Sequence, residues 1–220
     1  MQPLIIYGAG GHAREVAELV VDVNAEQPRW ELLGFLSDEP SGRGTALNGL
    51  PVLGGREWLD RAPADLNVII GIGSSPARRS IAEMLRSRGL RFPAIRHPTA
   101  LVSRHADLGP GTQVAAGCIL TVNARIGAFV ILNRSCNVSH DCRLGDFVTI
   151  APGVQLAGNV TVETGSDIGI GATVIQGVCV GEWALVGAGA AVTESLPANC
   201  TAVGVPAKVI KERRAGWHLE

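Results

Sequence analysis

The chain has 220 residues, enough for two small domains or one larger domain, with a formal net charge of −1 and an isoelectric point of about 6.5. Its lysines and arginines are scattered, which argues against a nucleic-acid partner, and we see neither a signal peptide nor an apolar stretch of the roughly 18 residues that a membrane span needs. The 28 glycines, beside only 4% aromatic residues, favour many tight turns around a narrow aliphatic core over a helical bundle.

Residues 1 to about 97 alternate between short apolar runs and segments with helical spacing of apolar residues. We expect strands at 4–7, 32–36 and 68–72, and helices at 13–23 and 76–88. The second helix should turn Ile81, Met84 and Leu85 inward and its four arginines outward. This alternation predicts a small Rossmann-like α/β domain, residues 1–97, with a mainly parallel sheet.

A glycine-rich loop, residues 8–13, separates the first expected strand from the first expected helix. Its backbone amides and the helix N-terminus make a natural diphosphate site. The loop reads GxGxxA rather than GxGxxG, so alone it is a weak dinucleotide fingerprint, and a plain tight turn is the simpler interpretation. At this point a nicotinamide-dependent oxidoreductase stays open as one function class.

From Val102 to Val192 every sixth residue is aliphatic, without an insertion, and the residue four places later is small or β-branched until Leu196. A period of six with one large and one small inward residue predicts short strands, three to a coil of about eighteen residues, wound into a parallel β-helix. We expect this domain at residues 98–205, followed by a C-terminal tail at 206–220. The aliphatic series is Val102, Leu108, Val114, Leu120, Ile126, Leu132, Val138, Leu144, Ile150, Leu156, Val162, Ile168, Val174, Val180, Val186 and Val192.

Cys118, Cys136 and Cys142 fall on the small inward positions of this repeat, which predicts a buried packing role rather than catalysis. The five cysteines of the chain match neither a CxxC zinc motif nor a disulfide scaffold. We therefore expect a cytoplasmic protein with reduced thiols.

His105 and His140 are the histidines of the repeat region, too few for the three histidine ligands of a zinc enzyme on this architecture, so we expect no metal. His140 follows Val138 at a corner of the coil, where side chains point outward. Its neighbour Asp141 can hold the imidazole in one tautomer and raise its basicity, as in a general base. A solvated pair without a function is the alternative.

Gly158 lies eighteen residues after His140 and therefore at the equivalent corner of the next coil, about 4.8 Å away. A glycine at that corner lets a thioester approach closely, and its N–H can donate to a tetrahedral oxyanion. A glycine that only forms the turn is the alternative interpretation. A β-helix without catalysis, acting as a binding module, also stays open, although its outward positions form no regular array.

Residues 132–146, continuing to 150–153, resemble the catalytic coil of the nucleotide-sugar N-acetyltransferases on the left-handed β-helix, the branch that includes bacillosamine and perosamine enzymes. The resemblance implies a homotrimer that uses acetyl-CoA. It implies His140 as the general base, Asp141 as the residue that tunes it, and Gly158 as the amide that contacts the acetyl carbonyl. Some members have a second histidine nine residues after the first, where this chain has Thr149.

The same resemblance implies that loops of the first domain bind a nucleotide-linked amino sugar. Because Thr149 replaces the second histidine, a GDP-linked 4-amino-4,6-dideoxyhexose such as GDP-perosamine is the preferred acceptor, ahead of a UDP-linked 4-amino sugar. The family match around His140 favours an amine over a hydroxyl acceptor. The implied sugar-nucleotide residues are Gly10, Gly11, His12, Ser37, Asp38 and Gly73, and the implied acetyl-CoA residues are Thr149, Gly158, Ile170, Ala188 and Lys208.

Overall fold

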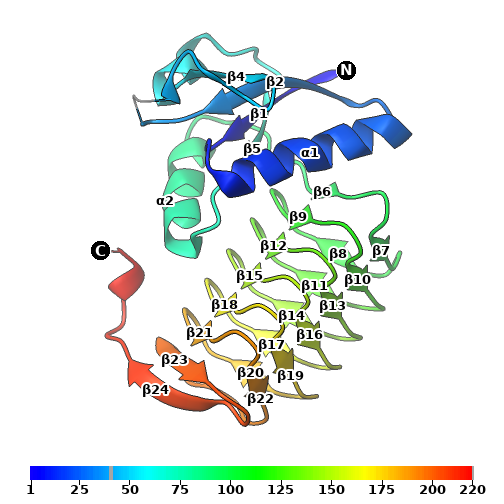
Figure 1. Cartoon of the computed structure of the whole chain (residues 1–220), viewed down its shortest axis with the longest axis vertical. Coiled ribbons are helices and arrows are strands. Elements are labelled where there is room, and N and C mark those ends of the chain that lie inside the picture. Colours follow the sequence, from blue (N-terminus) through cyan, green and yellow to red (C-terminus); the bar gives the residue numbers. More distant parts are fainter. Residues whose placement is uncertain (40–41, 220) are drawn as a thin grey trace. The chain divides into compact units, whose positions relative to one another are not determined.

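The computed structural model describes residues 1–39 and 42–219, and the chain divides into two compact units, Met1–Pro98 and Thr99–Glu220 (Figure 1). The first unit alternates strands and helices. The second is a ladder of very short strands. The change from one kind of structure to the other follows the change in sequence periodicity near residue 98.

The first unit is built on a sheet in the order β3-β4-β2-β1-β5, in which β1 pairs in parallel with both β2 and β5. This confirms the expected α/β architecture, whereas the antiparallel β3–β4 hairpin was not expected. Its elements are β1 (Gln2–Tyr7), α1 (Gly11–Glu26), β2 (Trp30–Leu36), β3 (Ala46–Leu47), β4 (Leu50–Gly54), the 3₁₀ helix η2 (Arg56–Arg61), β5 (Asn67–Ile70), α2 (Ser75–Arg86) and β6 (Ile95–Arg96).

The core of this unit follows from the apolar pattern of its strands and helices. Leu4 and Ile6 of β1 are fully buried, as the continuous apolar run of a central parallel strand requires. Helix α1 buries Ala13, Val16 and Val20, which share one face at helical spacing. The expected strand at 68–72 ends at Ile70, because the next residues form the loop that leads into α2.

One expected orientation in α2 is wrong. Leu85 is buried as expected, but Arg78, expected to point outward, is fully buried as well. Its guanidinium donates to the carbonyl oxygens of Ile72 at 3.0 Å and Gly73 at 2.7 Å and to Ser75 Oγ at 3.2 Å. Carbonyls of the loop after β5 need donors, so the arginine turns inward. Arg78 thereby ties this loop to the first turns of α2.

The second unit consists of two-residue strands, each paired in parallel with the strand eighteen residues along, as in Ile119↔Asn137 and Arg125↔Arg143. The strands are β7 (Leu101–Val102), β8 (Asp107–Leu108), β9 (Gln113–Val114), β10 (Ile119–Leu120), β11 (Arg125–Ile126), β12 (Ile131–Leu132), β13 (Asn137–Val138), β14 (Arg143–Leu144), β15 (Thr149–Ile150), β16 (Gln155–Leu156), β17 (Thr161–Val162), β18 (Asp167–Ile168), β19 (Thr173–Val174), β20 (Cys179–Val180), β21 (Leu185–Val186) and β22 (Ala191–Val192).

These strands form the faces of a coil, visible as ranks of parallel arrows in Figure 1. The β13 sheet contains β7, β10, β13, β16, β19 and β22; the β14 sheet contains β8, β11, β14, β17 and β20; the β15 sheet runs from β9 through β12, β15, β18 and β21 to β23 (Cys200–Val203) and β24 (Lys208–Glu212). The turns after the β13 sheet lead into the β14 sheet, and the turns after the β15 sheet lead back into the β13 sheet.

The inward side chains match the sequence pattern. The aliphatic series is buried from Val114 onward, while Val102 and Leu108 at the first coil are partly exposed. Cys118, Cys136 and Cys142 are fully buried, which confirms the predicted packing position. The predicted hexapeptide β-helix is therefore confirmed, with the first coil less buried than those that follow.

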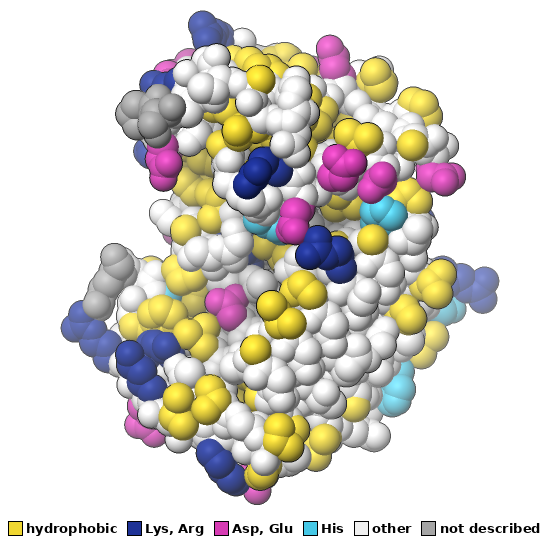
Figure 2. Space-filling model, viewed as in Figure 1, with side chains coloured by type: hydrophobic (Ala, Val, Ile, Leu, Met, Phe, Trp, Pro, Cys, Tyr) yellow, Lys and Arg dark blue, Asp and Glu magenta, His cyan; other side chains and the backbone are white. Residues whose placement is uncertain are grey.

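The segment expected as a separate tail continues the β15 sheet, because β24 pairs antiparallel with β23 and is followed by the 3₁₀ helix η3 (Trp217–Leu219). Lys and Arg side chains gather around this C-terminal segment on the face shown in Figure 2.

Across residues 1–39 and 42–219, no helix is long and apolar enough to cross a membrane.

Candidate active site

His140 and Asp141 form the turn between β13 and β14. His140 Nδ1 lies 2.9 Å from Asp141 Oδ2, with the two side chains 49% and 45% exposed. Because an ionised carboxylate only accepts hydrogen bonds, Nδ1 carries a proton in this contact, and in the neutral imidazole Nε2 is then the nitrogen with the free lone pair. The imidazole is thus held in the tautomer that a general base needs.

Gly158 lies directly against the ring of His140. A Cβ built on Gly158 would lie 2.3 Å from both Cε1 and Nε2 of His140, so only glycine admits this ring position. Within the described part of the chain, the Gly158 N–H donates to no protein acceptor. The structure therefore brings together the basic nitrogen and the amide that the sequence pattern paired.

Asp141 is oriented by a residue that sequence reasoning missed. Asn123, one coil earlier, donates from Nδ2 to Asp141 Oδ1 at 3.0 Å. The hydrogen bonds from Asn123 and then from His140, with the nearby charge of Arg143, lower the pKa of Asp141. Asn123 and Asp141 are eighteen residues apart, as are His140 and Gly158. The same spacing in the sequence could therefore have identified Asn123 as a neighbour of Asp141.

A hollow of about 510 Å³ lies on the outer surface of the β13 sheet beside this turn. Its lining includes Ser139 and Ala157, the residues immediately before His140 and Gly158. The hollow therefore reaches the residues that precede the turn, while His140 and Gly158 themselves are not part of its lining. Other lining residues are Ile119, Asn137, Gln155, Thr173, Ile175 and Gln176.

The expected acetyl-CoA residues are not gathered at this turn within one chain, except for Gly158. Ile170, 61% exposed, and Ala188 lie in turns that join the β15 sheet to the β13 sheet, which we call the Ile170 corner. The turn of His140 and Gly158, the His140 corner, lies at the opposite edge of the β13 sheet. Thr149 begins β15, and Lys208 of β24 lies 3.7 Å from Glu194 in an exposed ion pair.

A separate hollow of about 560 Å³ lies in the first unit, at the carboxyl ends of β1, β2 and β5. All six expected sugar-nucleotide residues line it: Gly10, Gly11, His12, Ser37, Asp38 and Gly73. Loops after parallel strands meet at one edge of a sheet, and α1 starts there, where the N-terminus of a helix attracts an anion. Gly8, with φ of 121°, passes so close that a Cβ would lie 2.8 Å from the Gly71 carbonyl oxygen.

Asp38 in this hollow is held by Tyr7 and Arg56, which sequence reasoning missed. Tyr7 donates its hydroxyl to Asp38 Oδ2 at 2.6 Å, and Arg56 Nη2 donates to the same oxygen at 2.8 Å. Desolvation raises the pKa of Asp38, but the hydrogen bonds from Arg56 and Tyr7 outweigh it and lower the pKa to about 2. Burial and the bond to Asp38 raise the pKa of Tyr7. The hollow thus contains a fixed carboxylate.

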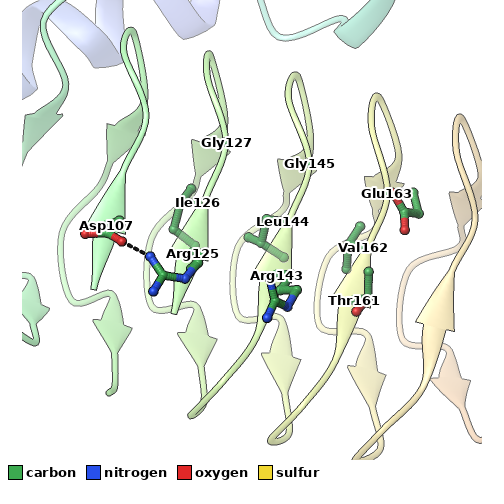
Figure 3. Close-up of a pocket in the computed structure, with 10 residues that line it drawn as sticks. All are labelled: Asp107, Arg125, Ile126, Gly127, Arg143, Leu144, Gly145, Thr161, Val162 and Glu163. Atoms are coloured by element: carbon green, nitrogen blue, oxygen red, sulfur yellow. Dashed lines mark hydrogen bonds and ion pairs between the residues drawn. The ribbon is translucent and has the colours of Figure 1, made fainter. Parts of the chain in front are cut away.

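A smaller hollow of about 340 Å³ lies on the outer surface of the β14 sheet (Figure 3). Arg125 pairs there with Asp107 on the neighbouring strand, and Arg143 lies one strand further along. None of the expected site residues lines this hollow. Among the described residues, no group of three His, Cys, Asp or Glu side chains could hold a metal ion.

Comparison with known proteins decides the family. Residues 3–85 match the family model of the PglD N-terminal domain. The chain is 32% identical over 200 residues to the GDP-perosamine N-acetyltransferase of Escherichia coli O157:H7, an alignment that covers 90% of this chain and 81% of that protein. The chain belongs to the sugar N-acetyltransferase family.

Solved structures of sugar N-acetyltransferases share the whole fold. The acetyltransferase domain of PglB from Neisseria gonorrhoeae FA1090, in complex with acetyl coenzyme A, has a TM-score of 0.88 at 35% identity, over 95% of this chain and 99% of that one. PerB from Caulobacter crescentus, in complex with CoA and GDP-perosamine, has a TM-score of 0.86 at 31% identity, over 96% and 98%. The expected left-handed β-helix is confirmed. Of the function classes left open, family membership favours the acyltransferase over the oxidoreductase and the binding module.

Proposed function

We propose that the chain transfers the acetyl group of acetyl-CoA to the 4-amino group of a nucleotide-linked 4-amino-4,6-dideoxy sugar, with GDP-perosamine as the preferred acceptor. The observation that carries the proposal is the contact between the His140 ring and the Gly158 backbone. It joins a proton acceptor and an oxyanion donor in one place. The relatives that act on or bind GDP-perosamine support the choice of acceptor.

The chemical step is a direct transfer. The amine nitrogen attacks the thioester carbonyl carbon, so a C–N bond forms and the C–S bond breaks. His140 Nε2 accepts the proton that the nitrogen loses, and the ionised Asp141 stabilises the resulting imidazolium. The Gly158 N–H donates to the carbonyl oxygen as negative charge develops on it. The thiolate takes up a proton, and CoA leaves as the thiol.

Acetyl-CoA binding is assigned to Thr149, Gly158, Ile170, Ala188 and Lys208. The His140 corner and the Ile170 corner lie at opposite edges of the β13 sheet, so one chain alone supplies only part of this set. A homotrimer in which the His140 corner of one subunit faces the Ile170 corner of its neighbour completes the site. Exposed apolar side chains on the β13 sheet and its edges are consistent with coverage by another subunit. They include Leu101, Ile119, Val122, Ile170 and Ile175.

The acceptor nucleotide is assigned to the hollow of the first unit. Its diphosphate would accept hydrogen bonds from the amides of Gly10 and Gly11 at the start of α1. The ionised Asp38, held by Tyr7 and Arg56, is an acceptor for N–H or O–H groups of the nucleoside. A UDP-linked 4-amino sugar is the second candidate, set behind the first because Thr149 stands where the second histidine is found in the bacillosamine type.

A thiol-release assay tests the proposal, with acetyl-CoA as donor and GDP-perosamine, a UDP-linked 4-amino sugar and a free amino sugar as acceptors. We expect the highest kcat/KM with GDP-perosamine and the lowest with the free sugar. Equal reaction of the free sugar would contradict the role of the first unit, because the diphosphate contacts would then contribute nothing to transition-state binding. The His140→Asn variant is the control for background thiol release.

A further inference from the structure

Successive coils place Asn123, Asp141 and Asn159 at the same turn position, eighteen residues apart along the His140 corner. Their φ angles are 61°, 60° and 57°, in the left-handed region that Asn and Asp tolerate better than most other residues. Among the described residues, a side-chain hydrogen bond joins only the first two of these, from Asn123 Nδ2 to Asp141 Oδ1 at 3.0 Å. The position is therefore the same in all three coils, but the contact is not.

We propose that Asn123 is a positioning residue of the acetyltransferase, which holds Asp141 so that its other oxygen stays on His140 Nδ1. The proposal rests on the function of His140 as the general base. Asn123 donates to Oδ1 and His140 to Oδ2, so the two bonds together fix both oxygens of one carboxylate. Its role is to act through Asp141, the residue to which its side chain donates.

Asp141 needs a second partner because both it and His140 are exposed to solvent. Asp141 is 45% exposed and His140 49%, and a single contact between half-exposed groups contributes little because water competes for both. A second hydrogen bond restricts rotation of the carboxylate and keeps it directed at the imidazole. An amide suits the position because it donates without adding charge, whereas a second carboxylate would repel Asp141.

The competing explanation is that Asn123 only forms the turn. Asn159 distinguishes this explanation from the positioning role. Asn159 has the same backbone conformation and is exposed, and in the described structure its side chain makes no hydrogen bond to protein. Its backbone N–H donates to the His140 carbonyl at 2.9 Å, a bond that glycine would retain. Gly177 occupies the same turn position one coil further with φ of 75°, so glycine adopts this conformation here.

The test compares Asn123→Gly with the matched control Asn159→Gly in the full-length protein. We expect kcat to fall roughly fivefold in Asn123→Gly, the worth of one hydrogen bond, with KM for acetyl-CoA unchanged, and no fall in the control. The ¹⁵N shifts of His140 should show a smaller population of the Nδ1–H tautomer in Asn123→Gly alone. The Asp141 carboxyl, followed by ¹³C NMR, should titrate at higher pH once the amide is lost.

Further variants exclude a purely structural effect. In the Asp141→Asn background, Asn123→Gly should cause no further loss of kcat, because the residue acts through the missing carboxylate. Asn123→Asp, which keeps the turn preference, should reduce kcat at least as much as Asn123→Gly. Equal kcat in the Asn123 and Asn159 variants, an unchanged His140 tautomer, or additive losses in the double variant would overturn the proposal. Full turnover by His140→Asn would instead refute the role of His140 as the general base, while the tautomer measurement would still test the positioning.

Discussion

The imidazole of His140 packs on the backbone of Gly158, where a Cβ would lie 2.3 Å from two ring atoms. In Gly158→Ala the half-exposed ring must rotate away, which separates the base from the amide. We predict a fall in kcat of about a hundredfold, as expected for a small misplacement of a reacting group, with little change in the melting temperature. Thiol-release kinetics and thermal unfolding measure the two effects. A fully active alanine variant would show that this contact is dispensable.

His140→Asn should lower kcat by roughly two to four orders of magnitude, the usual contribution of a general base, and leave acetyl-CoA binding intact. Asp141→Asn should cost less, because it removes the orienting carboxylate and keeps the proton acceptor. Calorimetric titration with acetyl-CoA serves as the binding control. Retention of wild-type turnover in His140→Asn contradicts the assignment.

Arg78→Met should destabilise the protein by about 2 to 3 kcal/mol, because the loop carbonyls of Ile72 and Gly73 lose their buried donor. The same change should raise KM for the nucleotide sugar, since Gly73 lines the hollow, without raising KM for acetyl-CoA. Arg79→Met is the matched control, because Arg79 pairs on the surface with Glu83. Equal stability of the two variants in urea unfolding would show that the buried contacts contribute nothing.

Asp38 should make stability depend on pH in acid. Its pKa in the folded protein is about 2, below the ordinary 3.8, so the ionised carboxylate stabilises the fold above about pH 4. This contribution is lost as pH falls from about 4 towards 2. Asp38→Asn should therefore be less stable at neutral pH and lose less stability across that window. Asp60→Asn, which removes the exposed pair with Arg88, is the comparison, and thermal unfolding across the pH series is the measurement.

Mixing two inactive variants tests the shared site. His140→Asn and Ile170→Asp change opposite edges of the β13 sheet. Co-expressed in equal amounts, they should regain activity at about a quarter of the sites, since an interface between subunits joins an intact His140 corner to an intact Ile170 corner. Light scattering should give a trimer. A monomer, or no recovery by mixing, would place the whole site within one chain.

The hexapeptide repeat was enough to predict the β-helix and most of the candidate catalytic turn. Every coil has the same length without an insertion, so a separation of eighteen residues translates directly into contact between neighbours, as for Gly158 and His140. Asn123 and Asp141 are also separated by eighteen residues, and their side chains are in contact. In this domain the spacing of residues along the sequence is therefore enough to predict which side chains lie next to each other on neighbouring coils.

The side-chain contacts of the first unit could not be predicted from the sequence. The strand order brings the ends of β1, β2 and β5 together, so the loop residues that line the hollow could be predicted as a set. The side chains that hydrogen-bond to those loops could not. Tyr7 reaches Asp38 across 31 residues, and Arg78 turns inward against its helical pattern to bond loop carbonyls. No fixed spacing relates such residues. Their contacts depend on how loops pack after the sheet has formed, and on buried polar groups that must each find a partner.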